Sequence, residues 1–159
     1  MPKAVDKDAC ELLDADHIAV KHLFVDYARL SMAADAGETK ALRTSLALKV
    51  CDDLTVHAQI EEEIFYPAVR EATRDAADAL AEAHSEHQDA KQLIADIRTI
   101  GTANAAMDTL MAELNVAVDH HVKEERDELF PKARTAPTLD LMALGKRLLE
   151  RQNQLLAKL

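Results

Sequence analysis

Hydrophobic residues recur every three or four positions along most of this chain, with polar residues between them. This spacing is typical of helices that bury one face, and the sequence has no run with the two-residue alternation of β-strands. Gly37, Gly101 and Pro131 interrupt the pattern, and Pro67 is expected to bend or end the second segment. The pattern predicts four long helices, over residues 7–34, 39–72, 76–100 and 105–132.

A shorter amphipathic segment follows Pro137, and Thr138 is its expected N-terminal cap. It predicts a fifth helix over residues 138–158, which we expect to cover the open end of the bundle rather than to form a dimer contact. Short connections between the long helices imply antiparallel neighbours. The expected fold is all-α: a single domain over residues 1–159, with an antiparallel up-down-up-down four-helix bundle over residues 7–133 and a short C-terminal helix.

The chain contains an internal repeat. HAQIEEEIFYP begins at His57 and HVKEERDELFP begins at His121, so that the His, a Glu four residues later and a Pro ten residues later coincide. Earlier in each half, a DH pair that ends at His17 matches an EH pair that ends at His87. The sequence therefore predicts two helical hairpins related by a pseudo-twofold axis, with a two-metal site at that axis.

Six polar residues interrupt the apolar faces of these helices. Residues four apart on a helix lie on the same face, so His57 points with Glu61 and His121 points with Glu125. A buried carboxylate without a partner costs several kcal/mol, and two that face each other also repel. One or two metal ions would compensate, with imidazoles as neutral donors and carboxylates able to bridge. The predicted ligands are His17, His57, Glu61, His87, His121 and Glu125.

A structural role is the alternative to metal binding. A single buried histidine is more often a hydrogen-bonded core residue than a ligand, and a glutamate near a core often bends towards water. Two matched sets of three on inward faces fit a shared metal better, because polar groups in a core are rarely tolerated without a partner.

His84 is a candidate fifth imidazole. It lies three residues before His87, about 60° round the helix, from where it could reach the same site or remain on the surface. We expect His22 and His120 to be surface residues. The solvated flanks of the ligand helices are expected to include Glu62, Glu63, Glu124 and Asp127.

Two further kinds of side chain could support the site. Asp16 and Glu86 could accept the second N–H of a ligand histidine. Tyr27 and Tyr66 are candidate phenols near the site, although a structural role is the more frequent one for such residues.

Composition and charge exclude several classes of function. The net charge of −10 argues against nucleic acid and against an anionic membrane surface as partners. The N-terminus shows no apolar core segment and no small-residue cleavage site, so we expect no signal peptide. No apolar run approaches the roughly 20 residues that span a bilayer. Cys10 and Cys51 form no disulfide framework and read as reduced thiols, so we expect a cytoplasmic protein.

The chain resembles the hemerythrin-like, or HHE cation-binding, family over roughly residues 8–133. The motifs that carry this resemblance are HAQIE followed by EEIFYP, EH, and HVKEE followed by RDELFP. The resemblance implies that the six predicted ligands bind an oxo- or hydroxo-bridged di-iron centre whose irons are bridged by the two carboxylates. Manganese or zinc could replace iron, since the same ligand types suit all three.

The sequence departs from the oxygen-carrying members of that family. Those members have two histidines four apart on the third helix and a His-x-x-x-x-Asp on the fourth, whereas here His84 and His87 are three apart and Glu125 follows His121 by four. Four histidines leave more open positions on the irons, which favours redox chemistry or sensing over reversible oxygen carriage. With His84 included, the ligand count returns towards that of the carriers.

Several functions therefore stay open. The leading expectation is a monomer or weak homodimer that binds or senses O₂, NO or peroxide, or that buffers iron. The alternative is a di-iron enzyme that turns over peroxide, as a catalase does, or NO. A ferritin-like site would need two Glu-x-x-His motifs and a zinc hydrolase would need His-Glu-x-x-His, and the sequence contains neither.

Overall fold

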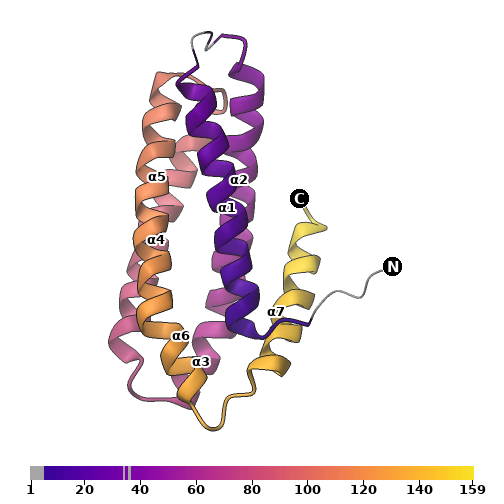
Figure 1. Cartoon of the computed structure of the whole chain (residues 1–159), viewed down its shortest axis with the longest axis vertical. Helices are drawn as coiled ribbons and strands as arrows, with labels where there is room; N and C mark the ends of the chain where they lie inside the picture. Colours follow the sequence, from indigo (N-terminus) through magenta and orange to yellow (C-terminus); the bar gives the residue numbers. More distant parts are fainter. Residues whose placement is uncertain (1–5, 34, 36) are drawn as a thin grey trace.

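Four long helices form the body of the molecule. The computed structural model describes residues 6–33, 35 and 37–159, and every regular element within them is helical. Each long helix packs antiparallel beside the next along the chain, and the fourth also packs against the first (Figure 1). This arrangement confirms the predicted all-α, up-down-up-down bundle. The long helices are α1 (Ala9–Ser31), α2 (Lys40–Ile60), α4 (Ala77–Ile100) and α5 (Ala105–Glu124).

Local hydrogen bonds explain where these helices begin and end. The Asp8 side chain accepts from the N–H of Glu11 at 2.8 Å, while the Glu11 side chain accepts from the N–H of Asp8 at 3.2 Å. This reciprocal cap starts α1 two residues later than predicted. Asn104 caps α5 in a similar way. Gly101 ends α4 with a φ of 70°, a backbone conformation that glycine adopts at little cost.

The second and fourth helices continue past their prolines through a wider, π-helical turn. The N–H of Tyr66 donates to the carbonyl of Glu61, five residues earlier, and the second repeat has the equivalent bond. Pro67 has no N–H and would clash with a carbonyl four residues earlier in a regular helix, and the wider turn lets the helix continue. The elements concerned are η1 (Glu61–Phe65), α3 (Tyr66–Ala72), η2 (Glu125–Leu129) and α6 (Phe130–Thr135).

The C-terminal helix α7 (Leu141–Leu156) lies beside α1, α2 and η1 (Figure 1). Its cap is Asp140, whose side chain accepts from the N–H of Ala143 at 3.0 Å. The prediction that Thr138 caps this helix was therefore wrong, because Asp140 offers the same kind of acceptor at the residue that directly precedes the first turn. Gly145 permits close packing, since a Cβ there would lie 2.5 Å from the carbonyl oxygen of Lys7.

The apolar core consists of two clusters with a polar layer between them. One cluster is built around Leu13, Ile60 and Phe130 and includes Leu144 and Leu148 of α7, which packs along the side of the bundle and not over its open end. The other is built around Phe24 and Leu114. Histidines and glutamates fill the layer between the clusters, so the fold places them in a medium of low dielectric constant. None of the described helices is long and apolar enough to cross a bilayer.

Candidate metal centre

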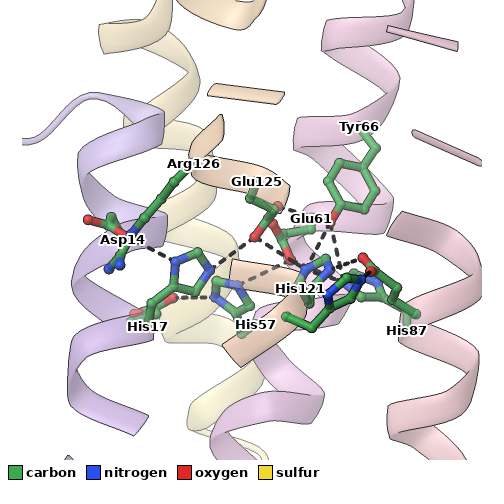
Figure 2. Close-up of polar contacts among 12 residues, drawn as sticks. Asp14, His17, His57, Glu61, Tyr66, His87, His121, Glu125 and Arg126 are labelled. Atoms are coloured by element: carbon green, nitrogen blue, oxygen red, sulfur yellow. Dashed lines mark hydrogen bonds and ion pairs between the residues drawn. The ribbon is translucent and has the colours of Figure 1, made fainter. Parts of the chain in front are cut away.

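All six predicted ligands meet in the polar layer (Figure 2). The two glutamates are fully buried, and no histidine of the six is more than 9% exposed. The residues form two groups of three, and within each group the candidate ligand atoms all lie within 4.8 Å of one another. The first group is His17, His57 and Glu125, and the second is Glu61, His87 and His121.

Glu61 lies between the two groups. Its Oε1 is 3.1 Å from Nε2 of His57 in the first group and 3.2 Å from Nε2 of His87 in the second. Burial favours the uncharged acid, but the imidazole of His57 and the other contacts outweigh it and hold the pKa of Glu61 well below its usual range. Glu61 is therefore a carboxylate placed to contact metals in both groups.

Glu125 has the same relation to the other imidazoles, and it also receives a phenol. Its Oε1 lies 3.0 Å from Nε2 of His17 and 3.2 Å from Nε2 of His121. Its Oε2 accepts a hydrogen bond of 3.0 Å from the hydroxyl of Tyr66. That hydroxyl also lies 3.3 Å from Nε2 of His87 and 3.5 Å from Nε2 of His121. Figure 2 shows the phenol pointing to the centre of the layer.

Each imidazole turns Nε2 towards the centre and Nδ1 towards an outer carboxylate. An N–H at Nδ1 that donates to a carboxylate fixes the ring and leaves the Nε2 lone pair for a metal. The four Nδ1 contacts are His17 with Asp14 at 3.1 Å, His57 with Asp16 at 2.9 Å, His87 with Glu62 at 3.3 Å and His121 with Glu86 at 2.8 Å.

The sequence pointed to only part of this outer layer. Asp16 and Glu86 lie where the second acceptors were expected. The assignment of Glu62 to a solvated flank was wrong, because its carboxylate reaches across to His87 on α4. The sequence prediction did not include Asp14 as an acceptor for His17. Its position three residues before His17 on the same helix was the signal that could have identified this role.

Among the other histidines, His84 lies outside both groups. Its side chain is exposed on the wall of a surface groove, so the structure does not bring a fifth imidazole to the centre. A step of three residues from His87 turns its side chain to the solvent face of α4. His22 and His120 are also exposed, as expected.

Comparison with known proteins agrees with this architecture. A sequence model of the hemerythrin HHE cation binding domain matches residues 8–133 of the chain. The chain belongs to the hemerythrin HHE cation-binding family.

A similar solved structure is the crystal structure of a hemerythrin HHE cation binding domain-containing protein from Mycobacterium kansasii. The two chains are 21% identical, with a TM-score of 0.77 over 96% of this chain and 89% of that chain. At this level of identity the likeness shows the hemerythrin-like fold. Among curated proteins, none matches the chain.

The residues of this hemerythrin-like centre fit a metal. Nε2 of His17, Nε2 of His57, both oxygens of Glu61 and Oε1 of Glu125 are buried and make no hydrogen bond of regular geometry among the described residues, although Nε2 of His17 lies 3.0 Å from Oε1 of Glu125. Buried polar atoms without partners are costly, and here they converge from opposite helices. Imidazole nitrogen and carboxylate oxygen are ligands that iron, manganese and zinc accept. The His and Glu groups of this family member can therefore bind metal.

The buried carboxylates of the hemerythrin-like centre also favour positive charge on their neighbours. Burial opposes protonation of His57, but the carboxylates of Glu61 and Asp16 outweigh it and raise the pKa of His57 to about 10. Burial acts in the same direction on His121, and Glu125 with its neighbours raises the pKa of His121 to about 12. The carboxylates thus attract protons to the imidazoles, and a metal cation would replace those protons.

A cavity of about 60 Å³ lies next to the imidazoles. All four ligand histidines contribute to its wall. The rest of the wall is mainly aliphatic, from side chains such as Leu54, Ala90, Ile94 and Val118. The hemerythrin-like centre therefore faces a small apolar space on one side and the phenol of Tyr66 on another.

Proposed function

We propose that this hemerythrin-like protein holds one iron in each of its two His/Glu groups and binds O₂, NO or peroxide at that di-iron centre. The observation that carries the proposal is the position of the two buried glutamates. Each has one oxygen within 3.2 Å of imidazoles from both groups, which is the placement expected of carboxylates that bridge two metals.

The donor set supports iron with open positions. Four imidazoles and two carboxylates are fewer donors than two six-coordinate metals accept. Iron would supply a redox couple and coordination positions for an added ligand. The protein's own part is to orient the imidazoles through the outer carboxylates and to keep bulk water away from the layer.

The cavity supports a small ligand. Its volume of about 60 Å³ exceeds what one water needs, but its wall offers few polar partners apart from the imidazoles. A diatomic molecule or peroxide fits such a space. This feature favours ligand binding over a role limited to buffering iron, since iron storage has no need of an apolar space beside the metals.

Turnover of peroxide or NO is a second candidate function, and Tyr66 is the observation that favours it. Burial, together with the carboxylates of Glu61 and Glu125, raises the pKa of Tyr66 well above its usual value, so the phenol keeps its proton at neutral pH. Its hydroxyl lies within 3.5 Å of Glu125, His87 and His121. A proton donor at this place suits reactions in which oxygen is reduced.

The first test is the metal content of protein from iron-supplemented cells, with an absorption spectrum. We expect one iron per group and charge-transfer bands in the near ultraviolet. The double variant His57→Leu with Glu61→Leu should lose the iron and the bands. Protein without iron, or with a single zinc and no such bands, would contradict the di-iron proposal.

The second test separates binding from turnover. Reduced, iron-loaded protein is mixed in turn with O₂, NO and peroxide, and both the spectrum and the consumption of each compound are recorded. A stable new spectrum without consumption indicates a carrier or sensor, whereas continued consumption indicates an enzyme. No response to any of the three would leave no support for a ligand-binding centre.

A further inference from the structure

The cavity beside the imidazoles reaches the surface between α2 and α4. Its wall includes the exposed residues Thr55 and Lys91 and the half-buried Ala58. Ala58 contributes only a methyl group at this point. Little side-chain volume therefore separates the imidazoles from solvent on the α2/α4 face.

The internal repeat creates an equivalent face between α1 and α5, where the corresponding residues differ. A groove of about 320 Å³ lies on that face. His17, Val118 and Val122 line both this groove and the inner cavity, so these three side chains form the wall between the two. The corresponding positions in the repeat are Ala58 with Val122, Thr55 with Asp119 and Lys91 with Lys21.

An ion pair also crosses the α1/α5 face at the level of the cavity. Nζ of Lys21 lies 2.8 Å from one oxygen of Asp119 and donates to Asn115 at 3.1 Å. Because Asp119 corresponds to Thr55 in the repeat, this contact lies over the position where the α2/α4 face has its opening. On the α1/α5 face the groove thus reaches the ring of His17, while Val118 and Val122 lie between the groove and the apolar cavity.

On the α2/α4 face the equivalent lysine is held elsewhere. Nζ of Lys91 donates to both oxygens of Glu62, at 2.9 and 3.0 Å. Glu62 lies seven residues after Thr55, which is about 10 Å along the helix. The threonine offers no charge to hold the ammonium group of Lys91, which pairs beside His87 while the rest of its side chain lines the cavity. Thr55 instead accepts from Arg98 at 3.5 Å, and Arg98 also donates to Asp52 at 2.9 Å.

We propose that small ligands reach the cavity beside the imidazoles between α2 and α4, past Thr55, Ala58 and Lys91, and that Val118 and Val122 close this cavity towards the α1/α5 groove. Ala58 is the residue that determines which molecules pass, because it contributes only a methyl group one helical turn from the exposed Thr55. The entrance suits small uncharged molecules such as O₂, NO and peroxide. This inference rests on the proposed function, since it concerns the ligands of that centre.

The test measures the rate at which NO associates with reduced, iron-loaded protein in a stopped-flow instrument. Ala58→Phe should slow association about tenfold, the factor that an increase of about 1.4 kcal/mol in the barrier produces. Ala58→Val, which copies the corresponding Val122 of the repeat, should have a smaller effect in the same direction. The matched control is Val116→Phe on the exposed surface of α5, where the native side chain is 70% exposed and outside both cavities.

A second pair of variants tests the closure by Val122. Val122→Ala should not slow association, and in the Ala58→Phe background it should restore part of the lost rate by thinning the α1/α5 wall. Iron content and the absorption spectrum are recorded for every variant. An unchanged association rate in Ala58→Phe with iron retained, or a loss of rate in Val122→Ala alone, would overturn the proposal.

A measurement without NO distinguishes failure of the entrance from failure of the proposed function. Crystals of the native protein are placed under xenon pressure. Xenon beside Ala58, on the path between Thr55 and the imidazoles, supports the entrance even if the iron binds no NO. Xenon only in the groove beside Val122 refutes it, whatever the iron binds.

Discussion

The two halves of the centre repeat the same ligands but differ in the aromatic residue above them. In one half, which we call the Phe130 half, Phe130 lies nearly parallel to the ring of His17, with ring centroids 6.1 Å apart and an interplanar angle of 14°. In the other, the Tyr66 half, the corresponding residue is Tyr66, whose ring lies 5.4 Å from that of His87. Of the two, only the tyrosine brings a hydroxyl to the centre, so the repeat has produced two candidate metal positions with different surroundings.

The outer carboxylates are also supported differently. In the Tyr66 half, Glu62 contacts His87 directly and is held by Lys91. The repeat places Arg126 where Glu62 stands, and in the Phe130 half its Nε donates to Asp14 at 2.7 Å. Asp14 in turn accepts from the histidine. In the Tyr66 half the carboxylate that contacts the histidine therefore comes from the neighbouring hairpin. In the Phe130 half it comes from the same helix as the histidine and is held by an arginine.

The C-terminal helix hydrogen-bonds an outer carboxylate in one half and not the corresponding one in the other. Gln152 of α7 donates to Asp16 at 2.9 Å, behind His57, whereas the corresponding Glu86 faces the exposed His120 at 3.1 Å. The Tyr66 half borders a surface groove of about 630 Å³ that Tyr66 itself lines. Divergence of a duplicated scaffold has thus left the ligands alike and changed their surroundings, and the Tyr66 half is the one we expect to react.

The largest effect should come from the glutamates that join the halves. Glu61→Ala and Glu125→Ala should each lose both metals, because each carboxylate contacts imidazoles of both groups. His17→Ala and His87→Ala should each lose only the metal of their own half. Metal content per folded chain, with helicity as the control, checks this order. A glutamate variant that keeps one metal would show that the halves are independent sites.

The exchange of the two aromatic residues comes next. Tyr66→Phe makes the Tyr66 half resemble the other and should lower turnover of peroxide or NO by about 10²-fold, the usual contribution of a positioned proton donor. Iron content should not change, because phenylalanine keeps the buried ring and removes only a hydroxyl that is not a predicted ligand. The matched control is Phe130→Tyr, which should not raise turnover. If Tyr66→Phe and the native protein had equal activity, the two halves would not differ in function through this hydroxyl.

The sequence predicted the bundle because its information is local. Three- and four-residue spacing defines the buried face of each helix, and Asp8 and Gly101 mark helix ends by local hydrogen bonds and backbone geometry. The same spacing placed the His and Glu of each repeat on an inward face. The four helices and the convergence of the six candidate ligands therefore followed from periodicity and repetition alone.

Periodicity could not decide the role of residues that depend on the π-helical turn or on a neighbouring helix, so Tyr66 was one of two candidate phenols only. In a regular helix Tyr66 would lie about 140° round the axis from Glu61, away from the centre. The wider turn η1 brings its hydroxyl to Glu125. Glu62 and Arg126 reach across to other helices, and periodicity within one helix carries no information on such contacts.

The outer carboxylates should have a smaller effect, confined to one half each. Glu62→Gln should weaken the metal of the Tyr66 half about 10- to 100-fold, and Asp14→Asn that of the Phe130 half by a similar factor, because each orients a single ligand imidazole. Competition with a chelator, followed by the stoichiometry of the metal that remains, measures both. Equal loss from both halves in either variant would contradict the assignment of these residues to separate imidazoles.

The smallest effect should come from Gln152, which acts on a metal only through Asp16 and His57. Gln152→Ala removes one hydrogen bond, worth about 0.5–1.5 kcal/mol, so the metal of the Phe130 half should weaken only about 2- to 10-fold. The control is His120→Ala, at the corresponding place behind Glu86. That side chain is 60% exposed and should change affinity less, because solvent screens its contact. An effect of His120→Ala larger than that of Gln152→Ala would show that α7 does not stabilise the half whose outer carboxylate it contacts.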